Sequence, residues 1–491
     1  MNKNINLTPM LGYDDRGSVF DAGGYILRSI GKGYFKEAAD IYVEYLRYNL
    51  SQYGIVKTEL VESQQVFKHQ KHIVSYPYEW PADMYKDAVL FHLNLFIELD
   101  KYGLTLKDAL PSNILFNFNN PVFIDFLSII KKEYLNNEAW LIEGCSFKDK
   151  RFSVVERMLI PFIIDPLLSM NDKNYGQARL MLSERACNVK ISESKLEEEK
   201  NIKNQKIFKS LIRYLKNLIF KRKNHKRIKI LLNSFKHNKE LVFIDYIKSL
   251  YDLVSSIDVT PPSSAYAKYY DEKKENFDLS ERGSWGEKQK NVFNILKKEK
   301  PDTVIDIGAN AGWFSFLAEN TGSKVISMDM DENCVNSIYG ITKKENKKIL
   351  QLVISFEDLT KKYYGNIADG PEYADRDYKN VPLFLAPVDR FKADFIMCLG
   401  LIHHLVLGMG HEISFVFQVL SQMTKKSILL EFVDINDQLI KSEPLFFKNI
   451  YKYNESSYNI DLVIKEGKKF FKNVEVFDSH PETRKLMLFK N

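Results

Sequence analysis

The sequence predicts an α/β protein built from more than one domain. Strand-like and helix-like segments alternate over residues 281–491, which is typical of a parallel sheet with flanking helices. Residues 1–170 combine hairpin-like strands with helical stretches, which predicts an α+β domain. Residues 171–280 have mainly helical patterns and are expected to form a helical connector. A chain of 491 residues is too long for one core, which agrees with this division.

The composition is that of an ordinary soluble protein. Apolar residues make up 45% of the chain and charged residues 27%. Gly and Pro are few, at 22 and 15, which excludes collagen-like and low-complexity classes. The beginning, "MNKNINLTPMLGYDDRG", has no apolar core and does not predict a signal peptide. The most apolar run, "MLIPFIIDPLLSM", is too short to cross a membrane and contains Asp165 and two prolines. The four cysteines are scattered without a metal-type pair, so we expect a reducing, cytoplasmic location and no bound metal.

The N-terminal elements follow from local patterns. "GSVFDAGGYILRSI" alternates like a hairpin that turns at Asp21–Gly24, and "YFKEAADIYVEYLRYNL" has the spacing of a helix. "QQVFKHQKHIVSYPYEWP" alternates like a second pair of strands. "ADMYKDAVLFHLNLFIELDKYG" has helical periodicity, and we expect this helix to be capped at Gly103.

The middle of the chain is strongly basic. Residues 200–239 contain fourteen Lys or Arg and no Asp or Glu, so the net charge of +6 leaves −8 (6 − 14) for the rest. "KIFKSLIRYLKNLIF" has one apolar stripe at helical spacing. One interpretation is a solvated helical connector, and another is docking on an anionic membrane surface. A third is contact with a polyanionic glycan or nucleic acid. The aromatic and glycine patterns of RNA-binding modules are absent, so we do not expect a nucleic-acid partner.

The C-terminal region begins with a strand, a glycine turn and a helix, in "PDTVIDIGANAGWFSFLAE". Gly308 and Gly312 let the backbone pass close to a ligand, and Asn310 lies between them. The helix that follows offers free N–H groups at its beginning. Asp306 ends the strand at the carboxyl edge of the sheet, where ligands bind in doubly wound folds.

The spacing of this turn selects among nucleotide-type ligands. D-x-G-x-x-x-G differs from the G-x-G-x-x-G of dinucleotide-binding folds. S-adenosylmethionine (SAM) has no pyrophosphate to cradle, but it has an amino-acid end that the turn and Asp306 can hold. A second strand, "KVISMDMDE", ends in Asp329, which can accept both hydroxyls of a ribose. In these motifs the chain resembles the class I SAM-dependent methyltransferases, which implies a Rossmann-like domain with SAM as its cofactor.

The remaining strands fit the same resemblance. "ILQLVIS" resembles the third strand, "ADFIMCLGLIHHLV" the fourth and "KSILLEFV" the fifth, while "NVEVFDS" and "RKLMLFKN" resemble a closing antiparallel pair. Many relatives have an acidic residue near the adenine, directly after the third strand. Here that place belongs to Ser355 or, with a small insertion, to Asp358.

Two histidines follow the fourth strand, in the loop that would face the methyl group. Methyl transfer to a hydroxyl requires removal of a proton, which a histidine of near-neutral pKa can accept. His403 and His404 are therefore candidate catalytic bases. The alternative is that one of them packs or orients the loop. Glu431 and Asp434, at the end of the fifth strand, are further candidates for the pocket.

Several stretches narrow the resemblance. "SYPYEWPADMYKDA", "GLTLKDALPSNILF", "PVFIDFLS", "AYAKYYDE", "GANAGWFSFLA" and "LGLIHHL", in this order, resemble the nodulation-type (NoeA-like) methyltransferases, bacterial proteins often associated with surface-glycan or oligosaccharide gene clusters. The resemblance spans most of the chain and implies O-methylation of a carbohydrate or lipid-linked glycan. Relatives often have a Trp before paired tyrosines, whereas here Tyr266 precedes Tyr269 and Tyr270.

A second resemblance lies in "GLTLKDALPSNILFNFNNPVFIDFLS". Asp108, Asn113 and Asp125 have spacings similar to the catalytic loop and metal-binding aspartate of protein kinases and small-molecule phosphotransferases. That resemblance implies that the first aspartate orients an acceptor hydroxyl and the other two residues hold magnesium with ATP. The chain departs from the pattern at Leu106 and Leu127, and its third strand offers an arginine, in "YILRS", in place of the usual lysine.

The sequence therefore predicts a SAM-dependent methyltransferase that acts on a glycan or small-molecule acceptor and needs no metal. Two alternatives stay open. The chain is bifunctional if the N-terminal domain uses ATP and magnesium, and it is a non-catalytic scaffold if the C-terminal domain does not bind SAM.

Overall fold

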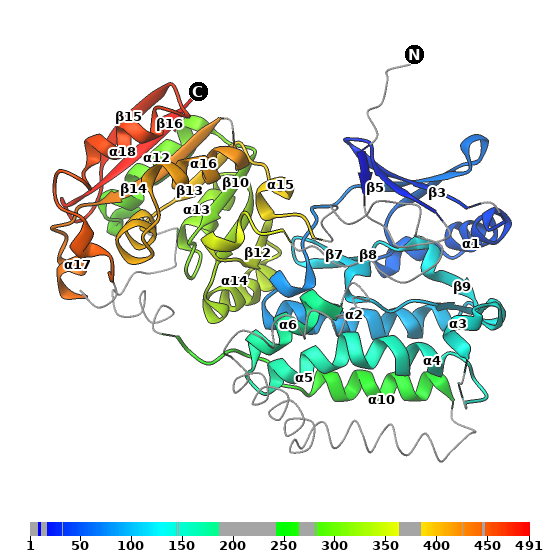
Figure 1. The fold of residues 1–491 in the computed structure, drawn as a ribbon. Coiled ribbons are helices and arrows are strands. Elements are labelled where there is room, and N and C mark those ends of the chain that lie inside the picture. Colours follow the sequence, from blue (N-terminus) through cyan, green and yellow to red (C-terminus); the bar gives the residue numbers. More distant parts are fainter. Residues whose placement is uncertain are drawn as a thin grey trace, which may run out of the picture.

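The computed structural model describes residues 8–10, 17–31, 33–143, 145, 147–185, 242–264, 279, 282–362, 384–424, 426–443 and 447–491. Figure 1 shows a large C-terminal sheet with its helices on one side of the molecule, and a smaller N-terminal sheet above a stack of helices on the other. Parallel and antiparallel sheets with packed helices confirm the predicted α/β class. The predicted division at residues 170 and 280 stays a prediction.

The C-terminal sheet has seven strands in the order β12-β11-β10-β13-β14-β16-β15. The first five are parallel, and β16 runs antiparallel to both of its neighbours. All five predicted parallel strands and the closing pair are confirmed. Their bounds are β10 (Thr303–Ile307), β11 (Lys324–Asp329), β12 (Ile349–Val353), β13 (Phe395–Cys398), β14 (Ser427–Val433), β15 (Asn473–Asp478) and β16 (Arg484–Lys490).

The inner strands are apolar because helices cover both faces of the sheet. All seven residues of β14 are buried, as expected for a strand with no solvent-facing side. On one face, α12 (Glu287–Glu299) and α13 (Trp313–Asn320) pack against residues such as Val304 and Leu429. On the other face, α16 (Ile413–Met423) and α18 (Ile460–Gly467) pack against residues such as Ile396. The order of the strands reverses between β10 and β13, and in doubly wound folds ligands bind beyond the carboxyl ends of the strands at such a point.

The N-terminal sheet is antiparallel, with the order β1-β2-β3-β5-β4. Its strands are β1 (Thr8–Met10), β2 (Val19–Asp21), β3 (Tyr25–Ser29), β4 (Thr58–Val61) and β5 (Val66–Gln70), and α1 (Phe35–Arg47) follows β3. The predicted hairpin and helix are confirmed.

The predicted strand pair in "QQVFKHQKHIVSYPYEWP" is wrong in its second half. Only Val66–Gln70 forms a strand, and its partners are β3 and the earlier β4. Residues 71–76 are irregular, and Pro77–Glu79 form a short 3-10 helix. Pro77 and Pro81 explain the error, because a proline has no N–H to donate to a strand ladder.

A layer of helices lies below the N-terminal sheet in Figure 1. Its centre is α2 (Ala82–Asp100), which packs beside α5 (Asp165–Asn171) and α10 (Phe243–Ser255). The predicted cap at Gly103 is wrong, because the helix ends at Asp100 with Lys101 as its C-cap, and Gly103, at φ +73°, belongs to the turn that follows. The basic stretch at 200–239 and the tyrosines at 266, 269 and 270 lie outside the described residues.

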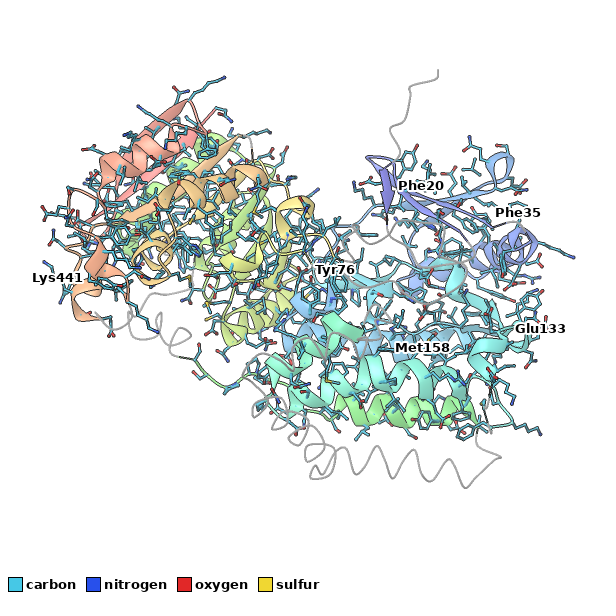
Figure 2. The ribbon with its side chains drawn as sticks, viewed as in Figure 1. Phe20, Phe35, Tyr76, Glu133, Met158 and Lys441 are labelled. Carbon is cyan, nitrogen blue, oxygen red and sulfur yellow. The ribbon has the colours of Figure 1, made fainter. Side chains whose placement is uncertain are left out.

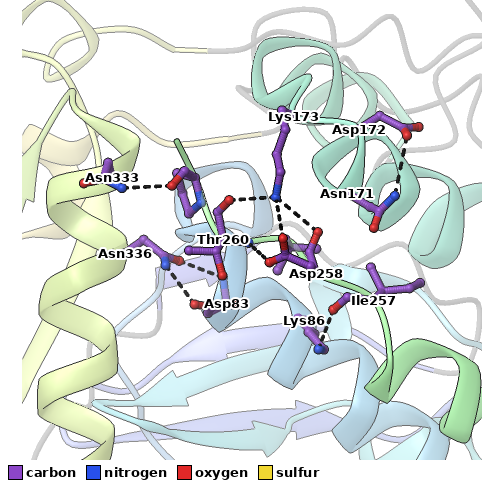
Figure 3. Close-up of polar contacts among 12 residues, drawn as sticks. Asp83, Lys86, Asn171, Asp172, Lys173, Ile257, Asp258, Thr260, Asn333 and Asn336 are labelled. Carbon is purple, nitrogen blue, oxygen red and sulfur yellow. Dashed lines mark hydrogen bonds and ion pairs between the residues drawn. The ribbon is translucent and has the colours of Figure 1, made fainter. Parts of the chain in front are cut away.

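The two halves of the molecule are joined through the beginning of α2. The N–H groups of Ala82 and Asp83 donate to the side chains of Glu332 and Asn336, at 3.0 and 2.8 Å, and both acceptors belong to α14 (Glu332–Glu345). Figure 3 shows Asn336 returning a bond to the Asp83 carboxylate, at 2.8 Å. Residues before α2 add to this interface, and Tyr76 lies in it in Figure 2.

The segment after α10 fills the space beside this interface. Lys173 holds the Asp258 carboxylate at 3.1 Å, and Lys86 donates to the Ile257 carbonyl (Figure 3). Asn333 of α14 donates to the Pro261 carbonyl at 2.9 Å. Residues 257–261 are thus tied to α14 and to both neighbouring parts of the helical layer.

Among the helices that the structure describes, none is long and apolar enough to span a membrane.

Candidate functional site

The glycine turn between β10 and α13 is built by close packing. Gly308 and Gly312 have φ values of +74° and +86°, which favour glycine. A Cβ on Gly312 would lie 2.8 Å from Ile338 of α14. A Cβ on Gly308 would lie 3.2 Å from Leu401, which belongs to the loop after β13. The turn therefore lies against both α14 and the loop that carries the two histidines.

The carboxylate of Asp329 fixes the turn from the next strand. One oxygen accepts the N–H of Asn310 at 2.7 Å, and the other accepts the N–H of Asp331 at 2.9 Å. Asn310 has φ +52°, and its own side chain accepts the N–H of Ala311. Burial raises the pKa of Asp329, and the N–H groups of Asp331 and Asn310 partly offset this effect. The structure thus brings Asn310 and Asp329 together, at the carboxyl ends of β10 and β11.

Asp306 is buried behind the same turn. It is 2% exposed, and one carboxylate oxygen accepts the Ser315 hydroxyl at 2.6 Å. Burial raises the pKa of Asp306 to about 7, and the charge of Asp329 adds to the rise, while Ser315 and Lys288 oppose it. A cationic ligand at this position would therefore stabilise the ionised form. Sequence analysis missed Ser315, which lies nine residues later on α13.

The place after the third strand is a short capped turn. The hydroxyl and N–H of Ser355 both donate to Asp358, at 2.7 and 3.2 Å, and Lys361 pairs with the same carboxylate at 2.6 Å. Burial alone raises the pKa of Asp358, but the hydrogen bonds of Lys361 and Ser355 outweigh it and leave the pKa below its usual value. Ser355 and Asp358, the two residues that the sequence offered for the place near the adenine, are thus hydrogen-bonded to each other.

His403 and His404 lie together, but they are deeply buried. Their ring centres are 4.1 Å apart, and both rings lie within 6 Å of Phe447. His403 is 1% exposed, and its ring nitrogens have no hydrogen-bond partner among the described residues. Burial and the neighbouring His404 lower the pKa of His403 well below its usual value. Burial and the charge of Arg484 lower the pKa of His404 to about 4.

A buried charge pair completes this edge of the sheet. Lys288, on the first turn of α12, lies 2.7 Å from the Glu431 carboxylate at the end of β14. The other oxygen of Glu431 accepts the Ser479 hydroxyl at 2.7 Å. Glu431 was a candidate from the sequence, whereas Lys288 was missed because its partner lies 143 residues away. Asp434 caps the following turn by accepting the N–H of Asn436 at 2.8 Å.

The residues proposed to hold SAM fit that group chemically. Two carboxylates, Asp306 and Asp329, lie at the carboxyl ends of the adjacent strands β10 and β11, beside a turn with positive φ. A carboxylate suits the ammonium of an amino acid, and a second suits the hydroxyls of a ribose. Within the described residues, no group of three or more His, Cys, Asp or Glu side chains is arranged to hold a metal ion.

The predicted N-terminal residues also come together. Asp125 pairs with Arg28 of β3 at 2.9 Å and accepts the Ser128 hydroxyl. Burial and the charge of Asp125 raise the pKa of Asp108 to about 7. The carbonyl of Asn113 accepts the N–H of the residue before Asp125. Magnesium does not fit this arrangement as it stands, because the Arg28 guanidinium already neutralises the carboxylate that would bind it.

Comparison with known proteins supports the resemblance seen in the sequence. No family model matches the chain. The chain is 24% identical to the nodulation protein NoeA of Rhizobium meliloti (strain 1021) over 387 residues, which are 78% of this chain and 74% of NoeA. The predicted resemblance to NoeA is therefore confirmed over most of the chain.

Solved structures match over shorter stretches. The bifunctional kinase-methyltransferase WbdD is 16% identical with a TM-score of 0.28, over 41% of this chain and 38% of WbdD. TehB of Haemophilus influenzae is 16% identical with a TM-score of 0.27, over 46% of this chain and 67% of TehB. The chain thus spans about two fifths of the length of the WbdD structure.

Proposed function

We propose that this chain is a SAM-dependent methyltransferase whose cofactor lies at the carboxyl ends of β10 and β11. One observation supports this most directly: Asp329 holds the Asn310 N–H of a positive-φ turn, while Asp306 is buried directly behind that turn. The likeness to NoeA agrees with it. The C-terminal domain, residues 281–491, would be a Rossmann-like class I methyltransferase domain, after a kinase-like domain at 1–170 and a helical connector at 171–280.

Each of the cofactor-binding residues would contact a different part of SAM. Asp306 would take the ammonium of the amino-acid end, Asp329 the ribose hydroxyls, and the backbone from Gly308 through Asn310 to Gly312 would lie against the ligand. Asp358 would lie near the adenine. When bound, SAM supplies a methyl group activated by a sulfonium.

The two histidines would act on the acceptor side. Their lowered pKa values keep both imidazoles neutral at pH 7, so they add no positive charge beside a cationic ligand. A neutral imidazole can accept a proton from a hydroxyl, which suits O-methylation. A pKa of about 4 makes His404 a weak base, so positioning of the acceptor would supply much of the rate.

The acceptor that we propose is a carbohydrate, either a small molecule or a lipid-linked surface glycan. This follows the NoeA resemblance, and a cytoplasmic enzyme would meet such a lipid-linked acceptor at the inner membrane face. The basic stretch at 200–239 would dock on anionic lipid there. Nucleic acid is not the partner that we propose.

The central experiment is calorimetric titration of S-adenosylhomocysteine into the full chain, Asp306→Ala and the exposed control Asp302→Ala. We expect micromolar binding to the wild type and the control, and loss of binding in Asp306→Ala. A folded wild type that does not bind this ligand would overturn the proposal and favour a non-catalytic scaffold.

A second candidate function rests on the N-terminal cluster. Asp108, Asn113 and Asp125 do converge, and a bifunctional enzyme would use them with ATP and magnesium. The Arg28–Asp125 pair opposes this, because a metal would have to displace the guanidinium. Titration of ATP with magnesium into the wild type and Asp125→Ala decides the matter, since only a true nucleotide site would bind in the first and not in the second.

A further inference from the structure

Lys288 is an unusual feature of the C-terminal site. Its side chain is 22% exposed, and its ammonium pairs with the carboxylate of Glu431, whose side chain is fully buried. Ser479, itself 6% exposed, holds the other oxygen of that carboxylate. The ammonium has three donors, and the bond to Glu431 uses one of them. The pair is therefore fixed on the Glu431 side. The ammonium also lies 5.0 Å from the centre of the Phe314 ring, and its remaining N–H groups have no hydrogen-bond partner among the described residues.

The register of the sheet puts this pair beside Asp306. Asp306 of β10 is level with Met397 of β13, which is level with Leu429 of β14. Glu431 lies two residues further along, so its side chain and that of Asp306 share one face. Strands β10 and β14 are two positions apart, about 10 Å. A lysine reaching in from α12, which covers this face, can lie between them.

Electrostatic effects agree with this placement. The charge of Lys288 lowers the pKa of both Asp306 and His403, which agrees with an ammonium at this end of the sheet. The Cβ position of Gly400, in the loop with the histidines, is 3.5 Å from the Glu431 carboxylate. Lys288 thus lies between the end of β10 and the loop after β13, at the switch point of the sheet.

Stability alone is a weak reason for such a pair. Burying a carboxylate costs desolvation free energy, and the attraction of its partner offsets that cost only in part. Replacing such a pair by apolar residues of similar volume often leaves the stability unchanged or raises it. The pair is more easily explained by a ligand that needs a fixed cation at this position.

We propose that Lys288 binds the α-carboxylate of the amino-acid end of SAM, with Glu431 and Ser479 as positioning residues that hold it in place. This inference rests on the proposed function. The ammonium and carboxylate of an amino acid share one carbon atom, so the groups that bind them must face the same site. Asp306 and the Lys288–Glu431 pair lie on the same face of the sheet, near its carboxyl edge. The charges also match, because Asp306, Lys288 and Glu431 sum to −1 when ionised and SAM carries +1.

The test compares SAM with decarboxylated SAM, which keeps the sulfonium and the ammonium but lacks the carboxylate. Calorimetry on the full chain would give both dissociation constants. A hydrogen bond between charged groups contributes about 1.5–3 kcal/mol, which corresponds to about 10- to 100-fold in affinity. The wild type should prefer SAM by that factor, and in Lys288→Met the two ligands should bind about equally.

Matched variants separate the inference from its alternatives. Lys290→Met changes an exposed lysine on the same helix and should keep the preference. Lys288→Met leaves Glu431 buried without its cation, so the double variant Lys288→Met/Glu431→Gln guards against misfolding. If SAM binds and either folded Lys288 variant keeps the full preference, the inference is wrong. If the wild type binds neither ligand, the proposed function itself fails, which is a different result.

Discussion

Asp306→Asn should make the protein more stable at neutral and alkaline pH while weakening its ligand site. The folded protein raises the pKa of this carboxyl from 3.8 to about 7, mainly through burial. Each pKa unit corresponds to 1.36 kcal/mol, so ionised Asp306 destabilises the ligand-free fold by about 4 kcal/mol. An asparagine has nearly the shape of the protonated acid, and its carbonyl can still accept the Ser315 hydroxyl.

The sign of the pH effect follows from linkage. Because the folded pKa is raised, the stabilising effect of the protonated carboxyl is complete below pH 3.8 and is lost as the pH rises through about 7. The variant should therefore match the wild type near pH 4. Its advantage should grow between pH 4 and 7, and then level off.

Urea denaturation at pH 5, 6, 7 and 8 measures this difference. From the linkage relation we expect a gain of about 1.5 kcal/mol at pH 5 and about 4 kcal/mol at pH 8. Asp302→Asn, an exposed position just before β10, is the matched control and should show no such trend. A variant that is less stable than the wild type at pH 8, or a gain that does not change with pH, would refute the reasoning.

Three further predictions concern Asp306, Gly312 and the buried Arg390–Glu79 ion pair. The affinity of the wild type for S-adenosylhomocysteine should rise about tenfold between pH 6 and 8, because the ammonium of the ligand needs ionised Asp306. Calorimetry on Asp306→Asn should show no such rise. Gly312→Ala should lower the affinity for S-adenosylhomocysteine more than tenfold, since the added Cβ would lie 2.8 Å from Ile338. The control Gly322→Ala, at φ +105° with no atom within 4 Å of the added Cβ, should keep the wild-type affinity. Arg390→Met should lower the free energy of unfolding by about 3–5 kcal/mol, because it leaves the Glu79 carboxylate buried without its cation. Urea denaturation should show that the double variant Arg390→Met/Glu79→Gln regains part of the lost stability.

Local patterns predicted the C-terminal sheet well. Each of its strands is a short apolar run followed by a turn, and the glycines at 308 and 312 lie where positive φ occurs. The pairing of Asp329 with the turn could be anticipated, because adjacent parallel strands end at the same edge. These features depend on near neighbours in the chain, which a sequence displays directly.

Features that depend on distant partners escaped prediction. The Lys288–Glu431 pair joins residues 143 positions apart, and Lys288 does not differ locally from a surface charge. The burial of His403 was missed for a similar reason, because the sequence shows a loop but not the Phe447 ring packed against it. The sequence suggested a near-neutral base there, whereas burial lowers the pKa of both histidines.

The N-terminus of α2 is capped by side chains from the other half of the molecule. Pro81 occupies the N-cap position and offers no side-chain acceptor for the free N–H groups of the first turn. Glu332 and Asn336 of α14 supply those acceptors from the C-terminal half. The absence of Ser, Thr, Asp or Asn before Ala82 was thus a signal that an outside partner was needed.

This shared cap links the two candidate sites physically. Helix α14 begins three residues after Asp329, and the side chain of Ile338 closes against Gly312 of the turn. The same helix holds α2 through Asn336, and α2 is followed by strand β6 (Leu104–Leu106) and then by Asp108. Helix α14 therefore contacts the N-terminal half through its hydrogen bonds to α2 and the glycine turn through Ile338.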